Sequence, residues 1–412
     1  MSTITSLLDT DLYKLTMQAA VLQHFPDAQA TFLFKNRTPA KQLNDEAVLW
    51  LKQQIAGLGE LRFAPDEIAF LKKHVGFLPE AYFEYLKTCK LDPSKQVKVD
   101  VTDGQLEIEV SGPWKDTILY EIPLLALVSE AYFKFVDKDW SYDGQTELAA
   151  NKAKQLIANG CVFSEFGTRR RRSLKTHDIV IAGILDGLKT AEGPGIFTGT
   201  SNVFLAKKYD LKPIGTVAHE WMMGVAAATG DYSKANLKAM ELWIETVGDA
   251  NAGVALTDTF GTESFLTDFK KPLTEIYNGV RQDSGDPLDY TKLLGDHYKS
   301  LGYEPMSKVI VYSDSLDVDK CAKYKAAAAE NGLKAAFGVG TYFTNDFKRS
   351  DGEKSTPLNI VIKIQQLNGK SCIKLSDNLS KNMGDPETVE RVKRELGYVE
   401  KGSVIDESKR WN

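Results

Sequence analysis

The sequence predicts an α/β protein, in which an irregular barrel of parallel strands and helices carries an outer α+β domain formed by both ends of the chain. Two observations predict this fold. From about residue 160, short apolar runs alternate with helical stretches, which is the pattern of parallel strands joined by crossover helices. Antiparallel hairpins flank that region on both sides. At 412 residues the chain is long enough for two domains.

The first third of the chain mixes helices with strands. QATFLFKN predicts a strand, and VKVDVTDGQLEIEVSG predicts a hairpin that turns at Asp103-Gly104. The apolar run ILYEIPLLALVSEAYF is interrupted by a proline, Glu121 and Glu130, so we expect a buried helix instead of a membrane span. These elements define a predicted N-terminal domain at 1–135.

Seven apolar runs predict the strands of a barrel domain at 136–348. The runs are CVFSEFGTR, GIFTGTSN, KPIGTVAHEW, NAGVALTDTF, YNGVRQDSGD, SKVIVYSDS and KAAFGVGTYF. Each ends in glycines and polar residues, and the carboxyl ends of barrel strands open at one mouth, so these residues are expected to share a cavity. After the barrel, NIVIKIQQLNGKSCIKLSD predicts a second hairpin, turning at Asn368-Gly369. Residues 349–412 are therefore expected to return to the outer domain.

Composition and charge exclude several classes of protein. A formal net charge of −5 favours local anion binding over the coating of a nucleic-acid backbone. None of the 4 cysteines belongs to a Cys-x-x-Cys pair, which argues against a zinc ribbon or a disulfide scaffold. The N-terminus lacks the pattern of a signal peptide. We expect a cytoplasmic protein with no membrane partner, and we leave a nuclear presence open.

Two loops after predicted strands have residues suited to a phosphorylated sugar. FGVGTYFTND places Gly338, Gly340 and Thr341 where backbone N–H groups can approach a phosphate, ahead of a predicted helix N-terminus. In VYSDSLDVDK, the carboxylate of Asp314 suits the paired hydroxyls of a ribose. Neither loop has the spacing of a Walker A loop or a dinucleotide fingerprint.

Two further loops hold candidate catalytic groups. In RQDSGDP, Arg281 can fork onto a carboxylate or a phosphate, and Asp283 can bind sugar hydroxyls or a magnesium-bound water. The structural alternative for this loop is a helix cap with a surface salt bridge. In GTVAHEW, His219 follows a predicted strand, and Glu220 is placed to orient its ring. The second histidine of a zinc-protease pattern is missing, so we favour a nucleophilic or phosphate-accepting histidine and assign no metal ligand.

Four consecutive arginines, Arg169 to Arg172, follow a predicted strand in EFGTRRRRSL. Such a run also serves in nuclear import and nucleic-acid binding, but no basic surface accompanies it here. We interpret Arg169 and its neighbours as cations that neutralise a pyrophosphate leaving group, with Phe166 as a flat face for an aromatic ring. Four charges cannot enter one site cheaply, so some must pair with acids or face solvent. Phosphate loops, aspartates and arginines together indicate phosphoribosyl chemistry.

Ordered blocks of the sequence resemble the nicotinate phosphoribosyltransferase family, from about residue 7 to the C-terminus. The blocks are LLDTDLYKLTM, FSEFGTRRRR, GTSN with AKKY, GTVAHEW, LTDTFGT, RQDSGDP, YSDSL and NLSKNMGDP. The resemblance implies a barrel of the type II phosphoribosyltransferase kind. It also implies an enzyme of NAD salvage by the Preiss-Handler pathway, classed with ATP-dependent ligases. This family makes nicotinate mononucleotide and pyrophosphate from nicotinate and phosphoribosyl pyrophosphate. ATP hydrolysis is coupled through a transient phosphohistidine, and Mg²⁺ enters with the phosphorylated substrates.

The same resemblance implies roles for individual residues. It places the phosphorylated residue at His219 and puts Arg169 on the pyrophosphate side. It places nicotinate between Phe166 and Tyr13, with Tyr13 contributed by a second subunit, which implies a homodimer with shared sites. The remaining implied contacts are Arg281 at the pyridine carboxylate, Asp283 and Asp314 at the ribose, and Gly338 and Gly340 at the 5′-phosphate with Thr341 beside them.

Nicotinate is favoured over its amide by the loop GTSN. Thr200 and Ser201 offer hydrogen-bond donors and the loop has no carboxylate, which suits an anionic ligand. A phosphoribosyltransferase for nicotinamide or quinolinate is the alternative within the same class. The alternative from another class is a nucleic-acid-binding role for the arginine run.

Overall fold

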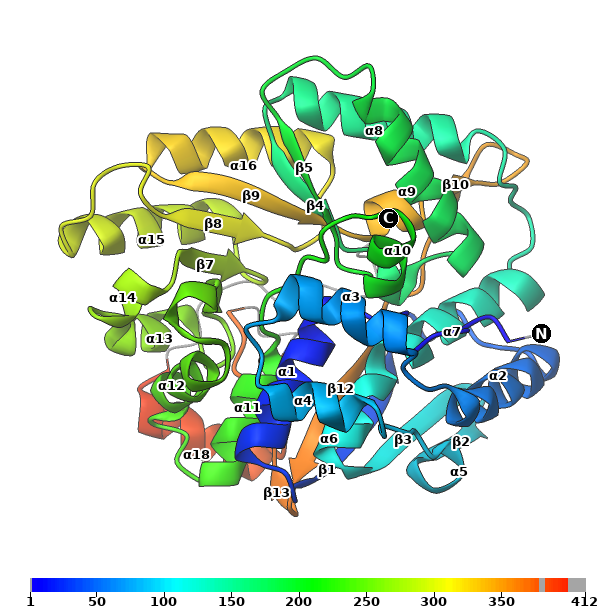
Figure 1. Cartoon of the computed structure of the whole chain (residues 1–412), viewed down its shortest axis with the longest axis horizontal. Helices are drawn as coiled ribbons and strands as arrows, with labels where there is room; N and C mark the ends of the chain where they lie inside the picture. The colour runs from blue at the N-terminus through cyan, green and yellow to red at the C-terminus, as the bar shows by residue number, and fades with distance from the viewer. Residues whose placement is uncertain (1, 378–381, 399–412) are drawn as a thin grey trace.

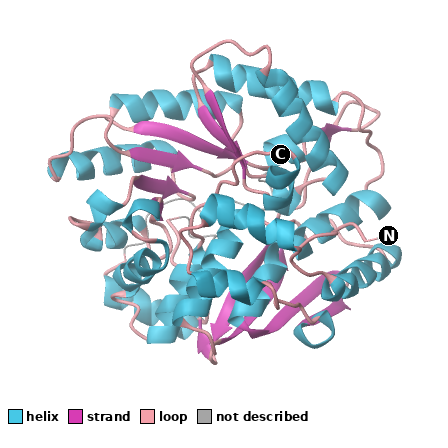
Figure 2. Ribbon diagram, viewed as in Figure 1, coloured by secondary structure: helices cyan, strands magenta, loops and turns pink. Residues whose placement is uncertain are grey.

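The structure is a computed structural model that describes residues 2–377 and 382–398. Its strands form two main groups, a parallel sheet and an antiparallel sheet, with helices packed around both (Figure 2). The part of the chain that it describes contains no helix with the length and apolar character needed to cross a bilayer. The domain bounds 1–135, 136–348 and 349–412 stay predictions, and residues 399–412 lie outside the described residues.

The parallel sheet contains six strands in the order β5-β4-β9-β8-β7-β6 (Figure 1). The strands are β4 Val162–Glu165, β5 Ile196–Thr200, β6 Val254–Leu256, β7 Gly279–Gln282, β8 Val309–Tyr312 and β9 Lys334–Val339. The accompanying helices are α8 Gln145–Ala158, α9 Leu174–Leu188, α10 Val203–Lys208, α11 His219–Thr229, α12 Ala235–Val247, α13 Thr262–Asp268, α14 Leu273–Ile276, α15 Pro287–Ser300, α16 Val318–Glu330 and α17 Thr341–Thr344. The predicted irregular α/β barrel is confirmed. The sheet order ends at β5 and β6, which leaves the ring of strands open there.

The seventh predicted strand, in KPIGTVAHEW, is wrong. The segment makes a single parallel bridge between Pro213 and Thr200 and then leads into α11. Pro213 has no N–H to extend a ladder. The start of α1 also packs there: Leu12 donates its N–H to the carbonyl of Ser201 at 2.9 Å, and a Cβ on Gly215 would lie 3.0 Å from the α1 backbone. The N-terminal segment thus lies where a seventh strand was expected to continue.

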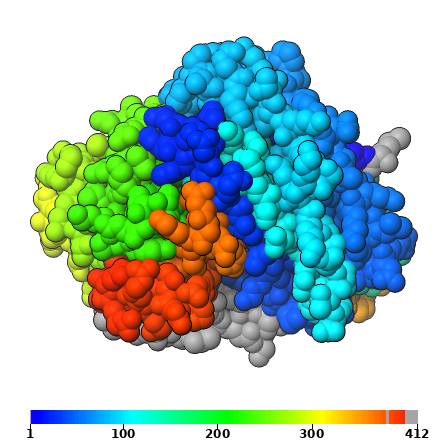
Figure 3. Space-filling model, turned by 90° about the horizontal axis from the view of Figure 1, so that it is seen from below, coloured from blue at the N-terminus to red at the C-terminus, as the bar shows by residue number. Residues whose placement is uncertain are grey.

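The antiparallel sheet joins the two ends of the chain in the order β13-β12-β1-β3-β2. Its strands are β1 Gln29–Asn36, β2 Val97–Thr102, β3 Gln105–Pro113, β12 Ile360–Leu367 and β13 Lys370–Ser371. Both predicted hairpins are confirmed. Asp103 and Gly104, like Asn368 and Gly369, have positive φ angles between 50° and 76°, as a two-residue type I′ turn requires. In Figure 3 the orange C-terminal residues lie between the blue N-terminal part and the green middle of the chain.

The helices of the N-terminal part cover this sheet and close one side of the barrel. They are α1 Leu12–His24, α2 Asp45–Gly57, α3 Pro65–Val75, α4 Glu80–Leu86, α5 Pro93–Gln96, α6 Trp114–Thr117 and α7 Glu121–Phe135. The apolar helix α7 is buried along most of its length, as predicted. Near the other end of the chain lie the short pair β10 Phe347–Lys348 and β11 Lys354–Ser355, and the helix α18 Pro386–Leu396.

Candidate active site

A cavity of about 210 Å³ opens where the carboxyl ends of the parallel strands meet the start of α1 and the strand β12. Every residue named from the sequence as catalytic or substrate-binding lines this cavity, except Thr200. The lining includes Tyr13, Phe166, Arg169, Ser201, His219, Arg281, Asp283, Asp314, Gly338, Gly340 and Thr341. The predicted convergence of strand ends on one mouth is therefore present in the fold.

His219 is the first residue of α11, and its imidazole ring is held at both nitrogens. Nδ1 lies 2.9 Å from the hydroxyl of Thr259, and Nε2 lies 3.1 Å from Asp283 Oδ2. The expectation that Glu220 orients the ring is wrong, because the Glu220 carboxylate accepts a hydrogen bond from Lys14. The carboxylate that lies closest to the histidine ring comes from a different strand end, 64 residues further along the chain.

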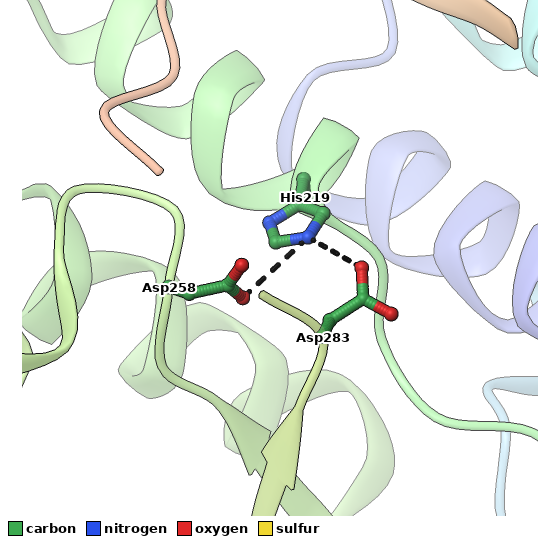
Figure 4. Close-up of side chains that lie close together, drawn as sticks. All are labelled: His219, Asp258 and Asp283. Atoms are coloured by element: carbon green, nitrogen blue, oxygen red, sulfur yellow. Dashed lines mark hydrogen bonds and ion pairs between the residues drawn. The ribbon is translucent and has the colours of Figure 1, made fainter. Parts of the chain in front are cut away.

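A buried carboxylate and an ammonium complete the surroundings of His219. Asp258 Oδ1 lies 3.6 Å from His219 Nε2 (Figure 4), and Lys374 Nζ lies 2.9 Å from the same nitrogen. Burial lowers the pKa of His219, and Lys374 lowers it further, against the opposing effect of Asp258 and Asp283. Since Lys374 also lies 3.3 Å from Asp258, the positive charge in this cluster is its ammonium, and we assign no metal to it.

Arg281 lies on β7, next to its last residue, and hydrogen bonds hold its guanidinium in one orientation. Its Nε donates to Ser313 at 2.8 Å, Nη1 to Thr216 at 3.0 Å and Nη2 to Asp283 at 2.9 Å. Arg281 therefore fixes the carboxylate that contacts His219. In the same loop Asp286 caps α15 by accepting from two backbone N–H groups. The helix-cap alternative is therefore correct for Asp286, whereas Asp283 lines the cavity.

Two glycines at the end of β9, Gly338 within the strand and Gly340 just after it, make room for Phe166. A Cβ on Gly338 would lie 2.4 Å from the Phe166 ring, and one on Gly340 would lie 2.9 Å from the Phe166 carbonyl oxygen. Neither position tolerates a side chain without moving Phe166. The helix expected to follow is one turn of four residues, Thr341–Thr344, which is too short for a sizeable N-terminal charge. The contact of Gly338, Gly340 and Thr341 with a phosphate stays a prediction.

Tyr13 lies on the cavity wall of its own chain. Ser201 beside it donates its hydroxyl to Asp11 at 2.7 Å, so a carboxylate from the N-terminal segment reaches the GTSN loop, which sequence reasoning missed. Burial raises the pKa of Asp11, although this hydrogen bond opposes the shift. Thr200 is fully buried and donates to Glu165 at 2.6 Å, so its expected contact with substrate is wrong.

The arginine run divides into two groups. Arg169, with 39% of its side chain exposed, and Arg170 line the cavity. Arg171 and Arg172 are fully buried and do not line the cavity. The expected role at a leaving group is therefore wrong for these two residues. The Arg171 guanidinium binds both carboxylate oxygens of Asp9, at 2.7 and 2.6 Å. The Arg172 guanidinium lies 3.6 Å from the ring centre of Phe133 and 4.2 Å from that of Phe347.

An Asp9→Asn variant is expected to unfold with a free energy about 3–5 kcal/mol smaller than the parent chain, because it leaves the Arg171 charge buried without its partner. Burial alone would raise the pKa of Asp9, but Arg171 holds it below the ordinary value. The contribution of Asp9 is therefore complete above the ordinary carboxyl range and lost as pH falls through the lowered folded pKa. Denaturant titrations at neutral and acid pH measure both effects. The control is Asp66→Asn, which removes an exposed carboxylate, and an equal loss in both variants would contradict the prediction.

The outer sheet also contributes cations that sequence reasoning missed. Arg37, which follows β1, and Lys363, on β12, line the cavity opposite the strand ends. Together with Arg169, Arg170 and Arg281 they make a cationic wall, and carboxylates such as Asp283 and Asp314 also line the cavity. Such a wall suits a ligand with several phosphate groups.

Comparisons with known proteins agree with this geometry. The model of the nicotinate phosphoribosyltransferase (NAPRTase) family matches residues 161–400, and that of the family's N-terminal domain matches residues 8–129. A nicotinate phosphoribosyltransferase of Saccharomyces cerevisiae is 54% identical over 99% of this chain and 99% of its own length. One of Methanosarcina acetivorans is 41% identical over 98% of this chain and 100% of its own length.

Solved structures give the same result. A crystal structure from Saccharomyces cerevisiae, described as a nicotinate phosphoribosyltransferase, superposes with a TM-score of 0.95 at 53% identity, covering 97% of this chain and 99% of its own. The enzyme of that name from Porphyromonas gingivalis gives a TM-score of 0.88 at 34% identity, covering 96% of this chain and 100% of its own. The motif NLSKNMGDP lies partly outside the described residues, at 378–381, but both family models and the relatives span the barrel and the outer domain. The chain therefore belongs to the nicotinate phosphoribosyltransferase family.

Proposed function

We propose that the protein transfers the phosphoribosyl group of phosphoribosyl pyrophosphate to nicotinate, giving nicotinate mononucleotide and pyrophosphate for NAD biosynthesis. The observation that carries this proposal is the cavity itself. In a chain of this family, it brings an aromatic face at Phe166, a forked arginine at Arg281 and a cationic wall to one mouth. An aromatic acid and a sugar polyphosphate fit these three features together.

The glycosidic carbon becomes positively charged as pyrophosphate leaves, so the site must stabilise negative charge growing on the leaving group. Arg169 and the other cations of the cavity are the groups for this. Mg²⁺ is proposed to enter bound to phosphoribosyl pyrophosphate and to ATP, as part of these substrates, and no side chain is assigned to it. Asp283 and Asp314 line the cavity with carboxylates suited to the ribose hydroxyls.

The pyridine nitrogen is the proposed nucleophile. It carries no proton, so no general base is needed, and stacking at Phe166 and Tyr13 with an ion pair to Arg281 would hold the ring in line. Positioning of this kind supplies a large part of the rate of such reactions. A nitrogen–carbon bond forms and the carbon–oxygen bond to pyrophosphate breaks, with the bonding electrons leaving on the pyrophosphate oxygen.

ATP is proposed to phosphorylate His219 during each cycle. A neutral imidazole nitrogen attacks the γ-phosphorus, the bond to the β-phosphate oxygen breaks, and ADP leaves. Water later removes the phosphoryl group as inorganic phosphate. The lowered pKa of His219 supports this role, because burial and Lys374 keep the ring in its nucleophilic neutral form.

The proposal is tested by one assay of the intact protein with phosphoribosyl pyrophosphate, ATP and each of nicotinate, nicotinamide and quinolinate. Nicotinate is expected to be used at least about tenfold better, a difference of about 1.4 kcal/mol. Equal use of the amide would contradict the assignment, and Asp11 would then be the carboxylate to examine. Arg170 to Arg172 are buried, so we expect no salt-dependent duplex binding, and such binding would favour the nucleic-acid alternative.

A Gly338→Ala variant is expected to bind nicotinate about tenfold more weakly, with a smaller change in the KM for phosphoribosyl pyrophosphate. The added methyl group would lie 2.4 Å from the Phe166 ring and must displace it. Steady-state kinetics with each substrate varied in turn measures the two KM values. Gly57→Ala is the control, because its Cβ would meet only Ser2 Oγ at 3.6 Å and its φ of −62° suits alanine. An effect on phosphoribosyl pyrophosphate alone would favour the phosphate role predicted from the sequence.

The predicted homodimer with shared sites rested on a second subunit supplying Tyr13. The homodimer stays a prediction. Tyr13 lines the cavity of its own chain, so we propose that each subunit supplies its own Tyr13. Mixing a Tyr13→Ala variant with an inactive Arg281→Met variant tests the point. We expect no recovery of activity, whereas recovery would indicate exchange of Tyr13 between subunits.

A further inference from the structure

Lys374 reaches His219 from the C-terminal hairpin, which is distant in sequence from every barrel strand. It follows β13, and its backbone pairs in both directions with Met383, at 3.0 and 3.1 Å. The side chain is 5% exposed, and Nζ lies 2.9 Å from His219 Nε2 and 3.3 Å from Asp258 Oδ2. A buried ammonium in contact with an imidazole is unfavourable unless the ring is neutral and presents a lone pair.

Charged groups on several elements act on the histidine. Asp258 after β6 and Asp283 after β7 favour the protonated ring (Figure 4), while Lys374 opposes protonation. Asp283 is itself paired with Arg281, and Glu220 on the histidine's own helix is paired with Lys14. Without Lys374, two carboxylates would face the imidazole, and no other cation within residues 2–377 and 382–398 contacts the ring. The ring would then take up a proton at a higher pH.

We propose that Lys374 is a positioning residue for phosphoryl transfer to His219: its ammonium keeps the imidazole neutral in a cluster of carboxylates and remains beside the phosphoryl group after transfer. The inference rests on the proposed phosphohistidine. The nitrogen–phosphorus bond forms with the ring's lone pair, the phosphorus–oxygen bond to ADP breaks, and the proton on the other ring nitrogen stays in its hydrogen bond. The C-terminal hairpin thus contributes the ammonium that contacts His219.

The test uses Lys374→Met and Lys374→Arg in the full chain. Each protein is incubated with [γ-³²P]ATP alone, and the rate of acid-labile, base-stable labelling is measured from about pH 5.5 to about pH 9. Lys374→Met is expected to move the acid limb of the rate profile to higher pH, with about a tenfold loss at low pH for each unit moved. Lys374→Arg should keep the limb near that of the parent. Lys308→Met is a matched control, because Lys308 is buried but bonds only to backbone carbonyls outside the cavity.

A second readout does not depend on phosphorylation. The imidazole of His219 is titrated by NMR in protein labelled at its 5 histidines, with the signal assigned from His219→Gln. Lys374→Met, or Lys374→Gln if the methionine variant does not fold, is expected to titrate at higher pH than the parent. Labelling that falls evenly at all pH values, with an unchanged imidazole titration, would overturn the inference. If the parent protein takes up no label but Lys374→Met still titrates at a higher pH than the parent, the phosphohistidine is overturned. The electrostatic role of Lys374 would then still stand.

Discussion

A His219→Ala variant is expected to lose ATP hydrolysis by about 10³-fold or more and to take up no acid-labile phosphate, while it keeps a slow transfer of the phosphoribosyl group. ATP hydrolysis and labelling are lost because the variant has no ring nitrogen to attack ATP. Phosphoribosyl transfer should persist because Phe166, Arg169 and Arg281 line the cavity whether or not the ring is present. Parallel measurement of ADP, pyrophosphate and nicotinate mononucleotide separates the two activities.

His24→Ala is the matched control for this experiment. His24 lies at the end of α1, outside the cavity lining, with its ring 3.0 Å from Thr246. It should hydrolyse ATP in step with product, as we propose for the parent protein. If His219→Ala still hydrolysed ATP in proportion to nicotinate mononucleotide, the phosphorylated residue would be elsewhere, and the cluster of Asp258, Asp283 and Lys374 would need another role.

The strands and hairpins that the sequence predicts correctly are those determined by local chemistry. Asp103-Gly104 and Asn368-Gly369 adopt positive φ where a tight turn needs it, so the hairpins can be recognised without knowing their partners. KPIGTVAHEW has the composition of a strand, but its neighbour is the N-terminal segment, which bonds to the loop after β5. A segment about 200 residues away takes the place beside β5 that a strand in KPIGTVAHEW would need. The residues of KPIGTVAHEW alone cannot show this.

The site follows the same division. Arg281 and Asp314 are predictable because parallel strands end at one edge, so residues at strand ends must meet. His219 reaches the same mouth as the first residue of α11, although the segment before it is not the predicted strand. Asp258 follows the end of β6, so the same reasoning about strand ends could have found it. Lys374 was not, since it enters from the antiparallel sheet. Asp11 was missed for a similar reason, because packing of α1 against the barrel determines its place.

Replacement of Arg281 by lysine is expected to lower kcat/KM for nicotinate by about 10²- to 10³-fold, which corresponds to roughly 3–4 kcal/mol. The guanidinium donates in three directions, to Thr216, Ser313 and Asp283. An ammonium on a flexible stem cannot make these bonds and still present a flat pair of donors to a carboxylate. Because lysine keeps the positive charge, the loss of kcat/KM measures the contribution of the planar guanidinium and its donors.

The split between kinetic constants decides how Arg281 acts. If it binds the pyridine carboxylate, the lysine variant should have a raised KM for nicotinate, a nearly unchanged KM for phosphoribosyl pyrophosphate, and relatively better use of nicotinamide. Arg349→Lys is the control, because this exposed arginine pairs with Asp137 outside the cavity lining and should leave both constants unchanged. A loss that falls instead on kcat and on ATP coupling would mean that Arg281 acts through Asp283 and the His219 ring, and that another cation, such as Lys363 or Arg37, meets the carboxylate.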